Sequence, residues 1–301
     1  MAIGNQIEDT DYNALQDKVQ ALLGTGSGSR GYGQPVPSAD VFQGNTITKA
    51  QWDALRNDIL SVRVHQDGTT PVLASIVKGT PINFAIISNY SSVLDVVDAN
   101  RFNIGPGQSV VSTKATQTTS SSWSTQAQAV LTMTFANSND ARYFFNSGGK
   151  IRIIGSRSGG SSTSQNNAWT NFLANIGAIS FGAATSAFVN FYDLNLSYQT
   201  FYQTGLSTPY SANFYRLEAA CDVASNTAGT ATQVQIRITL RDDYVDPATA
   251  PHTPSSVPPI DIVDGTLTLT VEELKAAGAL FPTGTFAITS PSYSLSAINL
   301  T

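Results

Sequence analysis

The sequence predicts a mainly β (α+β) protein: an antiparallel β-sandwich body with short helical insertions and a helical arm at the N-terminus. Three observations predict this class. Helical periodicity is concentrated in the first part of the chain and in a few short later segments. From about residue 105, apolar and polar residues alternate in runs that end in Gly, Ser and Asn turns. These runs follow one another without regular helical crossovers, which favours antiparallel sheets over parallel α/β winding.

Two amphipathic helices are predicted in residues 1–67, the N-terminal helical arm. The first begins near Asp9 or Thr10 and stops at Gly24. The second has a sharper start, because Thr48 and Gln51 fit a capping box. Their narrow apolar stripes need a partner surface and are candidate interface residues: Leu15, Val19, Leu22, Trp52, Leu55 and Ile59.

The connection between the two helices, residues 24–37, is long and rich in glycine. We expect it to be flexible, so that the helices can dock onto an adjacent subunit. Docking onto the sandwich of the same chain is the alternative. Residues 68–104 are expected to form a linking segment with a short helix, and residues 105–301 the β-sandwich body.

Alternation predicts the strands of the body at residues 108–119, 123–136, 150–157, 213–223, 230–241, 265–270 and 284–290. Short helices are predicted after Asn137 or Ser138, with a glycine exit at 148–149, and from Ser164. Thr270 and Glu273 fit a second capping box and predict one more helix. The proline-rich segment 247–259 is expected to be an extended surface connection.

Composition limits the classes of partner. Of 301 residues only 12% are charged, whereas about 25% is ordinary for a soluble domain. Such a surface suits close contact with neighbouring subunits more than electrostatic capture of a ligand. The net charge of −5 and the scattered basic residues argue against nucleic acid. No apolar run is long enough for a membrane span, and the single cysteine, Cys221, is expected to be buried in the core.

Patterns for catalysis or cofactor binding are weak, so we expect no enzyme, no cofactor and no metal. Gly26, Gly28 and Gly31 satisfy G-x-G-x-x-G, but a helix precedes them where a dinucleotide site needs a strand. Three aspartates and one histidine near the proline-rich loop could form a metal site: Asp242, Asp243, Asp246 and His252. Their spacing matches no recognised set of metal ligands. A solvated loop is the preferred interpretation.

The most informative segment is residues 139–153, NDARYFFNSGGKIRI, which joins two predicted strands through a short helix. It resembles a segment of the virion structural proteins of tailed bacteriophages, especially the contractile-tailed phages of marine cyanobacteria. Further segments that resemble this family are spread along the chain: 24–36 (GTGSGSRGYGQPV), 48–59 (TKAQWDALRNDI), 62–68 (VRVHQDG), 193–200 (DLNLSYQT), 210–213 (YSAN) and 290–293 (SPSY).

The resemblance implies a structural component of the virion, assembled in the host cytoplasm, and we expect a tail, baseplate or neck accessory protein. Its partners would be other virion structural proteins and further copies of itself. The alternative is an exterior receptor- or glycan-binding protein, an adhesin or decoration protein that contacts a host-surface glycan. Its candidate aromatic surface is Tyr198, Tyr202 and Tyr210, although such rings more often fill a core or an interface.

Overall fold

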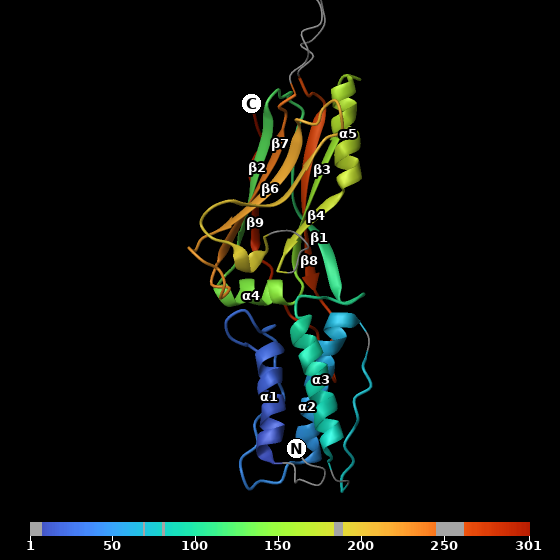
Figure 1. The fold of residues 1–301 in the computed structure, drawn as a ribbon, viewed down its shortest axis with the longest axis vertical. Helices are drawn as coiled ribbons and strands as arrows, with labels where there is room; N and C mark the ends of the chain where they lie inside the picture. Colours follow the sequence, from blue (N-terminus) through green and yellow to red (C-terminus); the bar gives the residue numbers. More distant parts are fainter. Residues whose placement is uncertain (1–7, 69, 80–81, 184–188, 245–261) are drawn as a thin grey trace, which may run out of the picture.

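Three helices form one end of the molecule and two antiparallel sheets form the other (Figure 1). The computed structural model describes residues 8–68, 70–79, 82–183, 189–244 and 262–301. The helices of the bundle are α1 (Asp9–Leu22), α2 (Lys49–Asp67) and α3 (Phe84–Ala99). The predicted start of α2 is confirmed, because the side chain of Thr48 accepts from the backbone of Gln51 and the Gln51 side chain caps in return.

The three helices run parallel, so that all three begin at the end of the bundle that lies away from the sheets (Figure 1). Near these first turns, the ring of Trp52 in α2 lies 5.0 Å from that of Tyr12 in α1 and 6.3 Å from that of Tyr90 in α3. At the other end, Gln66 in α2 donates to the carbonyl of Val97 in α3. Parallel neighbours require long return connections, and residues 23–48 and 68–83 supply them.

The predicted interface residues form the core of this bundle. Each is at most 3% exposed within its own chain: Leu15, Val19, Leu22, Trp52, Leu55 and Ile59. The partner surface that α1 and α2 need comes from α3, which is 16 residues long and contributes Tyr90, Leu94 and Val97. Contrary to the expectation from the sequence, these stripes are covered by the same chain and are not open to an adjacent subunit.

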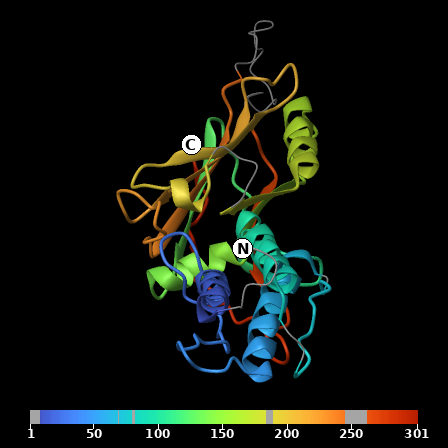
Figure 2. The same ribbon diagram turned by 60° about the horizontal axis from the view of Figure 1, so that its bottom comes forward.

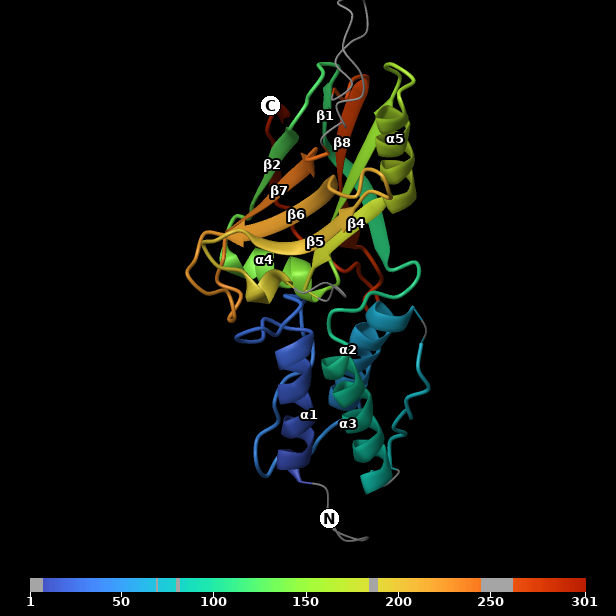
Figure 3. The same cartoon turned by 45° about the horizontal axis from the view of Figure 1, so that its top comes forward.

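Two antiparallel sheets make up the body, which confirms the predicted sandwich (Figure 3). The first has the order β1 (Ser109–Thr119), β8 (Thr266–Ala276), β3 (Lys150–Ser158), β4 (Ala178–Gly182). The second has the order β10 (Asn299–Leu300), β2 (Gln126–Thr134), β7 (Gln233–Arg241), β6 (Phe214–Cys221), β5 (Gln199–Gly205), and β9 (Ser292–Leu295) also pairs with β2.

The inner faces of the two sheets meet through large side chains. Phe181 of β4 and Phe201 of β5 are both buried, with ring centroids 5.0 Å apart. Cys221 is buried, as expected, at the end of β6. The inner strands of each sheet carry the alternating apolar residues from which they were predicted. In β7 the buried residues of this row are Val234, Ile236, Ile238 and Leu240.

Two helices lie against the sheets where the sequence predicts them. The first is α4 (Ser138–Asn146), which Asn137 caps and which ends before Gly148 with a φ of 81°. In Figure 2, where the bundle end of the molecule comes forward, α4 lies between the bundle and the sheets. The second is α5 (Ser164–Ile176), whose buried Trp169 packs against Trp123. A 3-10 turn, η1, covers Phe191–Asp193.

Two predictions in the C-terminal part are wrong. The capping box at Thr270 and Glu273 starts no helix, because β8 continues to Ala276 and Glu273 extends its buried row. The run 284–290 is no regular strand. Its backbone does not form a ladder with a neighbouring strand among the described residues. For example, the amide of Ala287 donates to the side chain of Gln34, which lies beside the bundle. The proline-rich segment 247–259 lies outside the described residues.

Candidate functional site

The glycine-rich loop after α1 and the helix α4 meet at the junction between bundle and body. Arg142 of α4 donates from Nη1 to the carbonyl of Gly28 at 3.0 Å and from Nη2 to that of Thr25 at 2.9 Å. A third bond from Nη2 reaches Asn139 Oδ1 at 3.0 Å. The arginine is 8% exposed, so these bonds to a buried cation are among the stronger ones in the chain.

Asn146 extends the same contact one helical turn further along α4. Its Nδ2 donates to the carbonyl of Gly31 at 2.9 Å, and its Oδ1 accepts from the hydroxyl of Tyr192 at 2.5 Å. That hydroxyl also lies 3.2 Å from the carbonyl of Ser29. Burial raises the pKa of Tyr192, which keeps it a neutral donor. Positions four apart share one helix face, which explains why both side chains reach one loop.

The loop needs glycine where it passes α4. Gly33 has a φ of 66°, and a Cβ built on it would lie 2.2 Å from Cδ2 of Tyr143. Only a residue without a side chain allows this approach. The loop is therefore held in one conformation by α4, contrary to the flexible connection expected from its composition.

His65 connects the end of α2 to the same junction. Its Nε2 donates to the carbonyl of Ser147, directly after α4, at 3.0 Å. Because the ring is 0% exposed, burial lowers the pKa of His65 to about 4, and the imidazole is neutral at pH 7.

The C-terminal segment completes the junction from the other side. Gln34 and the backbone of Ala287 bond in both directions, with Nε2 to O at 3.0 Å and N to Oε1 at 2.9 Å. The amide of Phe281 donates to Ser61 Oγ in α2 at 2.8 Å. Bundle and body consequently share one continuous hydrophobic core.

A buried carboxylate lies where β1, β8 and the C-terminal segment meet. Glu273 is 1% exposed and accepts from Tyr293 at 2.7 Å and from Ser290 at 3.0 Å. Lys114 of β1 lies 3.1 Å away and balances its charge. Burial, together with the bond to Glu273, raises the pKa of Tyr293. The sequence did not predict this cluster, because its members are remote from one another along the chain. The one available signal was the position of Glu273, an acidic residue in the otherwise apolar row of β8.

The candidate aromatic residues do not form one surface. The ring of Tyr198 lies under the guanidinium of Arg237 at 4.2 Å, and its hydroxyl donates to Gln235 at 2.9 Å. Tyr202 packs edge-on against the buried Tyr215, with ring centroids 6.2 Å apart. All three candidates are partly buried.

The third candidate, Tyr210, lies in the connection between β5 and β6 and pairs with Tyr244, with ring centroids 4.7 Å apart. Tyr210 and Tyr244 thus make a small aromatic pair that is separate from Tyr198 and Tyr202. The three residues singled out in the sequence belong to three different local environments.

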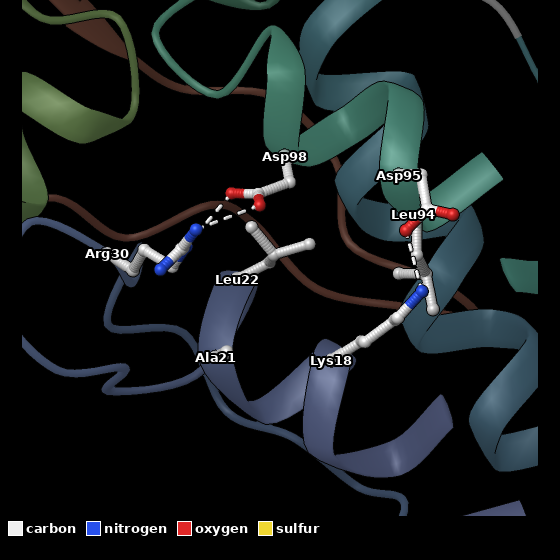
Figure 4. Close-up of a pocket in the computed structure, with 7 residues that line it drawn as sticks. All are labelled: Lys18, Ala21, Leu22, Arg30, Leu94, Asp95 and Asp98. Carbon is white, nitrogen blue, oxygen red and sulfur yellow. Dashed lines mark hydrogen bonds and ion pairs between the residues drawn. The ribbon is translucent and has the colours of Figure 1, made fainter. Parts of the chain in front are cut away.

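A cavity of about 180 Å³ opens between α1 and α3 (Figure 4). Leu22 and Leu94 form its apolar wall. Ion pairs flank it, with Lys18 at 2.6 Å from Asp95 and Arg30 at 3.0 Å from Asp98. Because each cation already faces a carboxylate, the cavity offers no free charge to a ligand and its lining residues connect the two helices.

Within the described ranges, no group of three His, Cys, Asp or Glu side chains is placed to hold a metal ion. Asp242 is buried and accepts from Gln165, whereas Asp246 and His252 lie outside those ranges. No helix in the part of the chain that the structure describes is long and apolar enough to cross a membrane.

Comparison with known protein families, curated proteins and solved structures gives no match to this chain.

Proposed function

We propose that this protein is a structural component of a tailed-phage virion, a non-enzymatic accessory protein of the tail, baseplate or neck. It acts through contacts with other virion proteins and with copies of itself. One observation carries the proposal. Two segments that resemble phage virion proteins, 24–36 and 139–153, are joined by Arg142 and Asn146 into one buried junction.

That junction supports a mechanical function because it fixes the bundle rigidly to the sheets. The segment 62–68 reaches it through His65, and the segment 290–293 contributes Ser290 and Tyr293 to the neighbouring buried carboxylate. Four of the segments that resemble the family, 24–36, 62–68, 139–153 and 290–293, therefore lie at points that hold the architecture together. Selection for a fixed shape, as in a particle subunit, accounts for that placement.

The surface supports contact with other proteins. Several large apolar side chains are at least 45% exposed: Phe42, Val72, Val77, Phe84, Val96, Val110, Val111 and Leu196. Phe84 is the first residue of α3 and lies at the end of the bundle away from the sheets. Together with the low charge, such side chains suit subunit interfaces.

The second candidate is an exterior glycan-binding protein of the virion. The partly buried pair of Tyr210 and Tyr244 is the observation that favours it, because aromatic rings provide a face for sugar rings. The two candidate functions predict different phenotypes for a phage particle in which Tyr210 and Tyr244 are replaced. A structural protein keeps its function when both tyrosines are replaced, whereas an adhesin loses adsorption to the host.

Gradient-purified particles of the phage that encodes the chain provide the test. Quantitative proteomics should find the protein in stoichiometric amount, and antibody-labelled cryo-EM should place it on the tail, baseplate or neck. Abundance in infected-cell lysate without incorporation into particles would contradict the proposal. Selective binding of the recombinant protein on a glycan array, lost in a Tyr210→Ala, Tyr244→Ala variant, would favour the adhesin instead.

A further inference from the structure

Strand β1 forms one edge of the first sheet. It is 11 residues long, and among the described strands only β8 pairs with it. No residue of β1 is fully buried, and Val110 and Val111 are 49% and 47% exposed. An edge of this length presents a row of unpaired N–H and C=O groups to any strand that approaches it.

The other edges are less suited to pairing. At the far side of the same sheet, β4 has 5 residues. In the second sheet, β5 has a register shift between Thr200 and Tyr202, and β9 and β10 cover the outer side of β2. Short strands, irregular strands and covered edges are the usual protection against edge-to-edge pairing. Among the strands that the structure describes, β1 is the longest edge strand whose outer side has no second backbone ladder, although β9 approaches it where Gln117 Nε2 donates to the carbonyl of Leu295 at 3.1 Å.

A charge on an edge strand normally repels a second copy, but the charge of β1 is turned inward. Lys114 is the single charged residue of the strand, and its Nζ lies 3.1 Å from the buried Glu273. The strand also has a bulge there, between Thr113 and Ala115. Beyond the bulge, residues 115–119 pair regularly with β8 and carry no charge. Two copies of this stretch can meet without like-charge repulsion.

The pairing pattern identifies the free backbone groups. Just before β1 begins, the amide of Ala277 donates to the carbonyl of Gln108. Every second residue of β8 therefore bonds to β1, and beyond the bulge these residues include Leu269 and Leu267, which face Gln117 and Thr119. In an antiparallel pair, the residues between the bonded ones direct their N–H and C=O groups outward. Beyond the bulge these are Thr116 and Thr118.

We propose that β1 is a homotypic interaction surface, on which residues 115–119 pair antiparallel with the same stretch of a second copy. Antiparallel pairing of identical strands has two-fold symmetry, the commonest symmetry of soluble dimers. The pairing joins two four-stranded sheets into one and satisfies the outward groups of Thr116 and Thr118 on both copies.

Analytical ultracentrifugation of the full-length protein tests the proposal. Wild type should sediment as a dimer, and dissociation should be seen on dilution. Thr118→Pro removes an outward N–H without removing a backbone bond to β8, and it loses the side-chain bond between Thr118 Oγ1 and Thr268 Oγ1, as any variant without the hydroxyl does. The variant should be a monomer with an unchanged circular dichroism spectrum. The matched control is Thr118→Val, which keeps the backbone N–H and should remain a dimer. A monomeric wild type, or a Thr118→Pro protein that still dimerises, overturns the proposal.

Hydrogen exchange gives a second measurement that needs no variant. The amides of Thr116 and Thr118 should exchange at least tenfold more slowly at a concentration where the dimer forms than after dilution to the monomer. A dimer without this protection pairs elsewhere and refutes the inference. Because the inference depends on the strand edge and not on the virion, a monomer would leave the proposed function standing. Absence from particles would leave the dimer standing.

Discussion

The imidazole of His65 lies flat against the ring of Phe286, with centroids 4.1 Å apart and an angle of 14° between the planes. His65 belongs to α2, whereas Phe286 belongs to the C-terminal segment that follows the last long strand. Tyr32 packs against the edge of the same imidazole. The neutral form fits this apolar stack, and a proton on the ring would place a charge between two buried rings.

We expect a loss of stability in mild acid that depends on His65. Its pKa is about 4 in the folded chain, below the ordinary 6.5 that holds when the chain unfolds. The unfolded state therefore binds the proton first, so the stabilisation is complete above pH 6.5 and declines as the pH falls toward 4. Between pH 7 and pH 5 this group should cost about 2 kcal/mol of unfolding free energy, as urea denaturation at both pH values would measure.

The control for this effect is His65→Gln, which keeps a donor for the carbonyl of Ser147 but does not titrate. Its stability should depend less on pH than that of wild type over the same interval. Equal pH dependence of the two proteins would show that other groups, such as carboxylates, cause the loss.

Replacing Arg142 by Ala should strongly destabilise the protein. The substitution removes two bonds to the glycine loop and leaves the carbonyls of Thr25 and Gly28 without this donor. We expect a cost of about 3 kcal/mol in chemical denaturation. Arg152→Ala is the matched control, because Arg152 forms a partly exposed pair with Glu272 and should cost about 0–1 kcal/mol. Similar costs for the two variants would contradict the importance assigned to the junction.

Separating the bundle from the body should abolish solubility. Residues 105–301 expressed alone would expose the surface that Phe281 and Phe286 present to the helices, and we expect aggregation. Co-expression with residues 1–104 should restore a soluble complex that copurifies. A soluble, folded body fragment with a native-like thermal transition would show that the shared core is dispensable.

Tyr198 and Phe201 should respond differently to truncation. Phe201 is 1% exposed between the sheets, so Phe201→Ala should cost about 3–5 kcal/mol. Tyr198 is partly buried under Arg237, and Tyr198→Ala should cost about 1–2 kcal/mol. Thermal denaturation of both variants measures the difference. Equal costs would mean that Tyr198 belongs to the core as fully as Phe201.

Local signals in the sequence predicted six of the ten described strands, and they missed β4, β5, β9 and β10. The capping residues Thr48 and Asn137 determine where their helices begin, and the alternating rows of β2 and β7 indicated their strands. These features depend on neighbours within a few residues, which a sequence displays directly. The failed capping box at Thr270 shows the limit, because the same local pattern lies inside a strand whose partners are remote.

Nonlocal relationships could not be predicted from the sequence. The apolar stripes of α1 and α2 required a partner, but nothing in them indicated that α3 would supply it. The contact between Arg142 and the glycine loop spans 114 residues in sequence. Glu273 is acceptable in the core only because Lys114, Ser290 and Tyr293 surround it. Each of these relationships follows from how the sheets and helices pack, which local periodicity does not encode.

The shared core also orders events during synthesis. A ribosome that releases the chain from its N-terminus completes α3 at Ala99, long before Phe281 and Phe286 emerge. Until then, the end of the bundle next to the sheets lacks the segment that seals it, and the nascent helices expose apolar side chains to solvent. Cotranslational folding can consequently produce the helices early but not their final arrangement. Chaperones that shield apolar surface would be needed most during translation of the body.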